Sequence, residues 1–221
     1  MKLTIFAATG GIGALALEQA IAAGHDVTAV VRNPDRLPSG VRSVPADLSA
    51  ADPAALESAV AGADAVLSGL GQRTRADAGI TSRGSAAIVA AMQATDVRRL
   101  VLVSAAPIGT VASPARPNPP RHDPGEGFWM RTLLTPMIKS ILRGPYAHLA
   151  LMEDLVRASG LDWTVVRPPR LTNGPLTGTY RTALDRNLRG GAAVSRADVA
   201  HFMLAALTRP DTIAHTVGIA S

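Results

Sequence analysis

The 221-residue sequence contains no cysteine, so disulfide bonds, thiolate catalysis and cysteine-ligated metals are excluded. Its five histidines show no paired spacing of the kind that places two metal ligands on one helix face. We therefore expect no metal site.

Long apolar runs are also missing. No apolar stretch reaches the roughly 18 residues that a membrane-spanning helix needs. The first apolar run is interrupted by Gly10, Gly11 and Gly13, and it leads directly into a helical pattern rather than a signal-peptide cleavage site. These features predict a cytoplasmic protein without a membrane partner.

Lysine is scarce, since only Lys2 and Lys139 occur, although the 22 basic residues exceed the 17 acidic ones and give a net charge of +5. The basic side chains are scattered and form no basic helix or patch interleaved with aromatics, so we do not expect nucleic acid as a partner. A small anionic ligand such as a nucleotide fits this charge balance.

Apolar, β-branched runs alternate with alanine-rich amphipathic runs along the chain. Strands are expected at 2–7, 27–32, 41–44, 65–69, 99–104, 162–167 and 215–219, and helices at 12–23, 53–60, 81–94, 146–159 and 196–207. This alternation predicts one α/β domain spanning 1–221, a doubly wound Rossmann fold with a mostly parallel sheet.

Residues 105–145 break the alternation. They contain eight of the sixteen prolines, and five basic residues against two acidic ones give this segment a charge of +3. Because it follows the fifth strand, the segment leaves from the carboxyl edge of the sheet, where open α/β folds bind ligands. We expect a lid-like insertion here, since long loops in compact domains are commonly lids or binding segments.

The stretch "FAATGGIGALALEQAI" follows the first strand and opens the first helix. Gly10 and Gly13 allow the backbone to approach a pyrophosphate, and the helix N-terminus directs free N–H groups at the anion. The alternative is a tight turn between packed elements. The strand before and the helix after favour a dinucleotide site.

The end of the second strand, "VVRNPDR", indicates which dinucleotide binds. Arg32 and Arg36 suit a 2′-phosphate through charge-assisted hydrogen bonds, which favours NADP(H). Asp35 is the competing candidate, because an acidic residue near this position binds the ribose 2′-hydroxyl in NAD sites.

Several stretches in order, among them "FAATGGIG", "LSGLG", "GSAAIVAAM", "SGLDWTVVRPPRLTNGPLTG" and "SRADVAHFML", resemble the atypical short-chain dehydrogenases of the NAD(P)H-binding, NmrA-like family, and within it the flavin reductases. The resemblance covers most of the chain and is weakest across 105–145. It implies a site built from the pyrophosphate contacts Thr9, Gly10, Ile12 and Gly13, the 2′-phosphate contact Arg32, the adenine contacts Asp47 and Leu48, the ribose neighbours Gly69 and Leu70, and the nicotinamide neighbours Ser104, Pro168, Pro169 and Arg170.

Two departures from the family pattern concern the chemistry. Ala7 stands where the first glycine of "GATG" is usual, and Glu153 and Asp154 stand where the flavin reductases have histidine and then lysine. Tyr146 is followed four residues later by Ala150, so the Tyr-Lys pair of ketone reductases is also missing. Carbonyl reduction is therefore disfavoured, because the alkoxide needs a donor with a lowered pKa.

The remaining catalytic candidates are Ser104 and Tyr146, with His148 as a substrate contact. Each has a structural alternative, as a loop cap for Ser104 and as helix surface for the other two. Residues 128–142 are amphipathic, and we expect Trp129 and Met130 to cover a flat acceptor.

Two functions follow from these patterns. The first is an NADPH-dependent reductase of a small aromatic acceptor such as a flavin or quinone, with catalysis largely by positioning. The second is a non-catalytic, NmrA-like sensor that binds NADP(H) and acts through a protein partner. A homodimer is left open.

Overall fold

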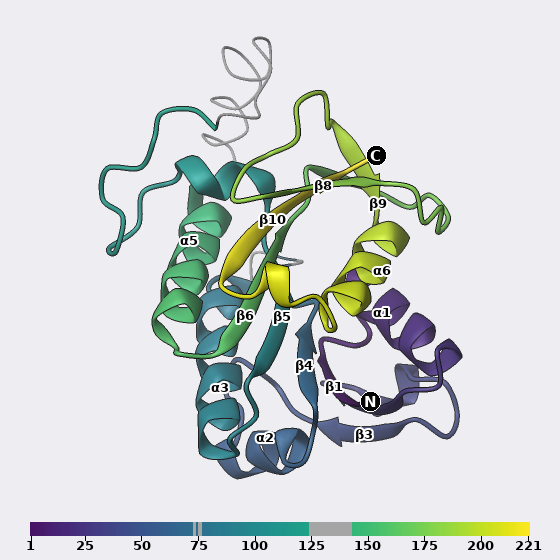
Figure 1. Cartoon of the computed structure of the whole chain (residues 1–221). Helices are drawn as coiled ribbons and strands as arrows, with labels where there is room; N and C mark the ends of the chain where they lie inside the picture. The colour runs from purple at the N-terminus through teal and green to yellow at the C-terminus, as the bar shows by residue number, and fades with distance from the viewer. Residues whose placement is uncertain (73, 75–76, 124–142) are drawn as a thin grey trace.

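The computed structural model describes residues 1–72, 74, 77–123 and 143–221. Its centre is an eight-stranded sheet with helices on both faces (Figure 1). Neighbouring strands are parallel except for the last pair, which is antiparallel. In order across the sheet, the strands are β3 (Arg42–Pro45), β2 (Asp26–Val31), β1 (Lys2–Phe6), β4 (Ala65–Ser68), β5 (Arg99–Val103), β6 (Asp162–Arg167), β10 (His215–Ala220) and β8 (Arg181–Leu184).

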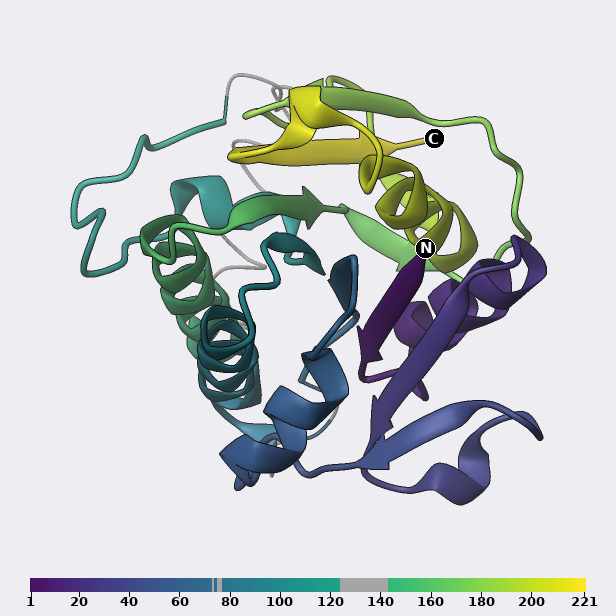
Figure 2. The same ribbon diagram turned by 60° about the horizontal axis from the view of Figure 1, so that its bottom comes forward.

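Two hydrophobic cores lie on opposite faces of this sheet, between it and the helices that Figure 2 shows on either side. One face is covered by α1 (Gly11–Ala22) and α6 (Arg196–Ala206), and the other by α2 (Pro53–Val60), α3 (Ile80–Ala94) and α5 (Arg143–Ala158). Successive strand residues point to opposite faces, so Ile5 enters the first core and Phe6 the second. The near-continuous apolar strands therefore follow from burial on both sides.

The predicted Rossmann-type α/β fold is confirmed. Two helix starts are capped by side chains: Asp52 accepts a hydrogen bond of 3.1 Å from the Ala54 N–H, and Ser195 accepts one of 2.9 Å from the Asp198 N–H. These side chains satisfy backbone donors that the first turn of a helix leaves without an intrahelical partner.

The structure contains three short strands that the sequence did not predict. β8 pairs with β10 at the sheet edge, while β7 (Arg170–Thr172) and β9 (Ala193–Ser195) form a separate parallel pair. Each has only three or four residues, too few to show a period of two. α5 begins at Arg143, three residues before the expected start at 146.

The described part of the insertion after β5 contains a short 3₁₀ helix, Ala106–Thr110, and a single bridge between Ser113 and Arg116. The expected amphipathic stretch 128–142 lies outside the described residues, so its lid role stays a prediction. Within the described part of the chain, no helix is long and apolar enough to cross a membrane.

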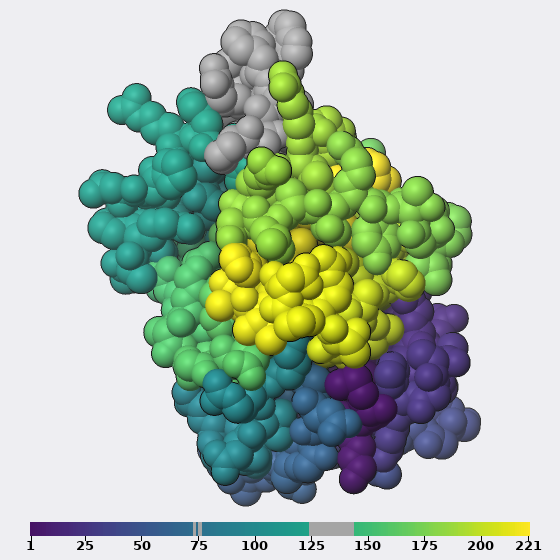
Figure 3. Space-filling model, viewed as in Figure 1, coloured from purple at the N-terminus to yellow at the C-terminus, as the bar shows by residue number. Residues whose placement is uncertain are grey.

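The last helix of the chain packs beside the first. In Figure 3 the C-terminal residues, in yellow, lie directly against the N-terminal residues, in purple. The contact is made by α6, which packs against α1 through a shared core that includes Leu17 and Phe202. The last helix is thereby brought to the glycine turn at the start of α1.

Candidate nucleotide-binding site

A pocket of about 570 Å³ lies where the strand order reverses, between β1 and β4. Open α/β sheets bind ligands at this position, outside the carboxyl ends of the strands. Residues that directly follow β1, β2, β3, β4 and β5 line the pocket. Of the residues predicted for the site, those in the lining are Thr9, Gly10, Ile12, Arg32, Asp47, Leu48, Gly69, Leu70 and Ser104.

Gly13 lies behind the pocket wall and allows the helix and the strands to pack closely. A Cβ atom at this position would lie 2.2 Å from the Ala7 carbonyl oxygen, and one at Gly69 would lie 2.7 Å from the Gly13 nitrogen. Side chains at either position would therefore force the glycine turn away from β4. The two glycines keep the N-terminus of α1 at the pocket, and the free N–H groups of a helix N-terminus are able to bind an anion.

The turn itself is held by a hydrogen bond of 2.7 Å from the Gly10 N–H to the Ala7 carbonyl oxygen. Ala7 has a φ of 56°, in the left-handed region that glycine adopts without strain. The alanine that departs from the family pattern therefore retains the backbone geometry at a conformational cost.

An apolar wall lines one end of the pocket. Leu48 and Leu70 are buried and pack against Gly84 of α3, where a Cβ atom would lie 2.7 Å from Leu70 Cδ2. Beside this wall, Asp47 Oδ1 accepts hydrogen bonds of 3.0 and 2.9 Å from the N–H and hydroxyl of Ser49. These bonds, the backbone one foremost, lower the pKa of Asp47 below its usual value.

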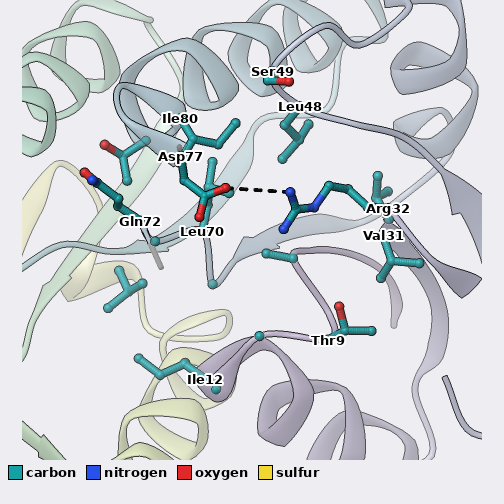
Figure 4. Close-up of a pocket in the computed structure, with 18 of the residues that line it drawn as sticks. Thr9, Ile12, Val31, Arg32, Leu48, Ser49, Leu70, Gln72, Asp77 and Ile80 are labelled. Carbon is teal, nitrogen blue, oxygen red and sulfur yellow. Dashed lines mark ion pairs between the residues drawn. The ribbon is translucent and has the colours of Figure 1, made fainter. Parts of the chain in front are cut away.

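Arg32 extends from the end of β2 and meets Asp77 across the pocket (Figure 4). Arg32 Nη1 lies 3.6 Å from Asp77 Oδ1. Sequence reasoning did not single out Asp77, because it lies between the "LSGLG" stretch and α3, where the sequence carries no motif. The other predicted phosphate ligand, Arg36, lies instead in a separate groove between α1 and the segment after β2.

Arg196 is a second lining residue that the sequence did not single out. A Cβ atom on Gly11 would lie 3.0 Å from Arg196 Cδ and Nε, so the arginine stem covers the start of α1. Arg196 Nη1 donates a hydrogen bond of 2.6 Å to Asn173 Oδ1. Only the packing of α6 on α1 brings this arginine to the glycine turn, which local sequence patterns do not reveal.

Ser104 closes the other end of the pocket, directly after β5. Its hydroxyl donates a hydrogen bond of 2.8 Å to Oε1 of Glu153, a fully buried residue of α5. Arg167, at the end of β6, donates to both carboxylate oxygens, and Arg157 donates to Oε2 at 3.0 Å. Glu153 is thus a buried anion between two guanidinium groups.

Tyr146 and His148, the two candidate residues on α5, lie beside the pocket rather than in its lining. Tyr146 is half-buried, and this burial raises the pKa of its hydroxyl. His148 Nδ1 lies 3.2 Å from the Ser82 hydroxyl, on the side of α5 that meets α3. α5 instead presents Pro145 and Leu149 to the pocket.

Pro168, Pro169 and Arg170, which follow β6, also lie outside the lining, although the next residue, Leu171, is part of it. Pro168 accepts a hydrogen bond of 2.9 Å from the Ala106 N–H, which joins this segment to the loop after Ser104, and Pro169 and Arg170 continue into β7. Trp129 and Met130, the predicted acceptor contacts, lie outside the described residues. No group of three or more potential metal ligands occurs in the ranges that the structure describes.

Comparison with known families agrees with this geometry. The model of the NAD(P)H-binding family matches residues 7–210, from the glycine turn to the segment before β10. The match covers most of the chain, so the protein belongs to the NAD(P)H-binding family, as its sequence motifs predicted.

Solved structures similar to this chain include a putative NADH-flavin reductase from Streptococcus pneumoniae, with 24% identity, coverage of 100% of this chain and 99% of that one, and a TM-score of 0.74. An anaerobilin reductase from Escherichia coli O157:H7 matches with 21% identity, coverage of 99% and 97%, and a TM-score of 0.74. A short-chain dehydrogenase/reductase from Veillonella parvula in complex with NADP matches with 20% identity, coverage of 100% and 94%, and a TM-score of 0.74. At these identities the likeness establishes the shared fold.

Proposed function

We propose that the chain is an NADPH-dependent oxidoreductase that transfers hydride to a flavin, a quinone or a related conjugated aromatic acceptor. Membership of the NAD(P)H-binding family supports the cofactor class. The flavin and anaerobilin reductases among the structural neighbours support an aromatic acceptor.

The residues of the pocket fit a dinucleotide from end to end. The absence of side chains at Gly13 and Gly69 leaves the cradle for the pyrophosphate, and the Leu48 and Leu70 wall suits a flat adenine ring. Arg32 in the lining supports binding of a 2′-phosphate, and Ser104 after β5 supports a nicotinamide at that end. The nicotinamide supplies the hydride, and the chain binds it, orients it and excludes water.

The observation that carries the acceptor class is the hydrogen bond from Ser104 to Glu153. Because the only hydroxyl proton of Ser104 is directed to the carboxylate, the serine presents lone pairs to the pocket and accepts hydrogen bonds there. A ketone reductase needs a proton donor for the developing alkoxide. Electron-poor flavins and quinones take their proton from solvent, so orientation of the reactants is sufficient.

NADPH is favoured over NADH by Arg32. A guanidinium binds a phosphate through charge-assisted hydrogen bonds, whereas the ribose hydroxyl of NADH gives it no anion to bind. The fork of two arginines expected from the sequence is reduced to one in this pocket, since Arg36 lines the neighbouring groove.

A sensor that binds NADP(H) without turnover is the second candidate. It is favoured by the closed ion pair of Glu153 and Arg167, which occupies a position that the resemblance to flavin reductases would assign to catalysis. In a sensor the pocket would keep its nucleotide affinity, and no acceptor would be reduced.

Steady-state assays separate the two candidates. Purified protein is mixed with NADPH or NADH and, in parallel, with FMN, FAD, a soluble naphthoquinone, and an aliphatic ketone, and oxidation of the nicotinamide is followed by absorbance. The proposal expects NADPH oxidation with a flavin or quinone and none with the ketone. Nucleotide binding without turnover on any acceptor would favour the sensor, and ketone reduction would refute the acceptor class.

A further inference from the structure

The guanidinium that faces the adenosine end of the pocket already has an anionic partner. Arg32 Nη1 and Asp77 Oδ1 are 3.6 Å apart, and both residues line the pocket (Figure 4). The Arg32 side chain is 61% exposed, whereas that of Asp77 is only 17% exposed. The carboxylate is therefore the fixed member of the pair, and the arginine is the member able to exchange partners.

The second oxygen of Asp77 fixes its orientation. Asp77 Oδ2 accepts hydrogen bonds of 2.9 Å from both the N–H and the hydroxyl of Thr74. With Oδ2 bound to its own turn, Oδ1 remains directed toward Arg32. The contact across the pocket thus follows from a defined local geometry rather than from two mobile surface chains.

A second carboxylate adds to the negative charge around Arg32. Asp47 lies close enough to interact with both residues: the positive charge of Arg32 helps to lower the pKa of Asp47, and the negative charge of Asp77 opposes this. Asp47, Asp77 and Arg32 together carry a net charge of −1. An incoming 2′-phosphate would meet a guanidinium that is partly neutralised and two like charges beside it.

We propose that Asp77 sets the nucleotide preference of this site by competing with the 2′-phosphate for Arg32. The inference rests on the proposed binding of NADPH at Arg32. A nucleotide with a 2′-phosphate must replace the Arg32–Asp77 contact by an Arg32–phosphate contact, whereas a nucleotide with a 2′-hydroxyl leaves the ion pair in place. Asp77 therefore weakens the binding of NADPH but not that of NADH, and it reduces the preference for NADPH that Arg32 creates.

Asp77→Asn tests this competition, because it removes the charge and retains an oxygen that Thr74 can bind. The probes are adenosine 2′,5′-bisphosphate and adenosine 5′-monophosphate, which differ only in the 2′-phosphate, titrated by calorimetry. Because an exposed ion pair contributes little but adds to repulsion of the phosphate, we expect the bisphosphate to bind about three- to tenfold more tightly. The monophosphate should change by less than about twofold.

A matched control is available at the other end of β2, where Asp26 and Arg42 form an exposed ion pair of 3.5 Å. Asp26→Asn removes the same charge from the protein without touching the pocket, and it should leave both affinities unchanged. An equal gain for the bisphosphate in Asp26→Asn and Asp77→Asn would reduce the effect to net charge and overturn the inference.

An Arg32→Ala variant distinguishes failure of this inference from failure of the proposed NADPH binding. If wild type does not prefer the bisphosphate and Arg32→Ala changes neither affinity, the 2′-phosphate site itself is refuted. If Arg32→Ala abolishes a preference but Asp77→Asn leaves it unchanged, only the competition is refuted. Weaker binding of both probes to Asp77→Asn would make Asp77 a ribose ligand and also overturn it.

Discussion

Ser104 and Glu153 are joined by a hydrogen bond of 2.8 Å between the serine hydroxyl and a carboxylate that is 0% exposed. This contact connects the pocket to a buried ion pair, because Arg167 donates to both oxygens of the same carboxylate. The orientation of the serine hydroxyl is thereby set from the core of the protein, and not by the ligand.

Glu153→Gln should lower the free energy of unfolding strongly. The change removes the carboxylate charge that Arg167, which is 5% exposed, binds with two donors, and breaking a buried pair in this way costs about 3–5 kcal/mol. Urea unfolding followed by circular dichroism measures the loss. Asp154→Asn on the same helix is the control, and we expect it to cost less than about 1 kcal/mol; equal costs would show that Glu153 is not a structural anion.

Ala7→Gly should stabilise the protein by about 1 kcal/mol, because glycine adopts the left-handed backbone conformation without strain. Ala214 has a φ of 62° and lies at the start of β10, away from the pocket. Ala214→Gly should therefore give a similar gain in the midpoint of thermal denaturation, and it should not alter nucleotide affinity. A loss of stability in Ala7→Gly alone would mean that the alanine side chain packs favourably in the turn.

Asp198 makes stability depend on pH. Burial raises the pKa of this carboxyl, but hydrogen bonds from the Thr177 and Gly178 N–H groups and the Ser195 hydroxyl outweigh it and hold the pKa below 3.8. A carboxyl with a lowered folded-state pKa stabilises above its unfolded pKa, and this contribution disappears as the pH falls through the folded value.

Wild type should therefore lose stability on acidification below about pH 4 more steeply than Asp198→Asn, which should be less stable near neutral pH. Urea midpoints measured across this range for both proteins give the comparison. Parallel curves would show that Asp198 does not contribute to the pH dependence.

Tyr146→Phe should reduce turnover by less than about tenfold, compared with about 100- to 10,000-fold for loss of a positioned general acid. Burial raises the pKa of Tyr146, and Ala150 occupies the position where a lysine would lower it. Steady-state rates with the best acceptor, with nucleotide affinity measured in parallel, provide the check. A larger loss with binding intact would identify the tyrosine as a proton donor and restore carbonyl reduction as a function.

The order of the main strands and helices could be predicted because strands that are buried on both faces consist almost entirely of apolar residues. Asp52 and Ser195 also mark two helix starts, since a helix cap depends only on neighbouring residues. The glycine turn could be predicted because Gly10 and Gly13 belong to one short stretch of sequence. β7 and β9 were missed because strands of three residues carry no periodicity.

The polar partners in the pocket could not be predicted, because each depends on tertiary contact. Asp77 meets Arg32 only after β2 and the segment before α3 are placed side by side. From the sequence alone, Glu153 resembles a solvent-exposed residue on an amphipathic helix. Its burial becomes evident only in the structure, where Ser104 and Arg167 contact its carboxylate.

Anaerobic single-turnover mixing tests the central claim most directly. Protein saturated with NADPH is mixed with one equivalent of FMN in one experiment and with one equivalent of a naphthoquinone in another. The absorbance of the nicotinamide and that of the acceptor are followed together. The account predicts that one acceptor is reduced for each NADPH consumed, faster than with NADH and faster than without protein. Tight NADPH binding with no protein-dependent change in either absorbance would contradict it.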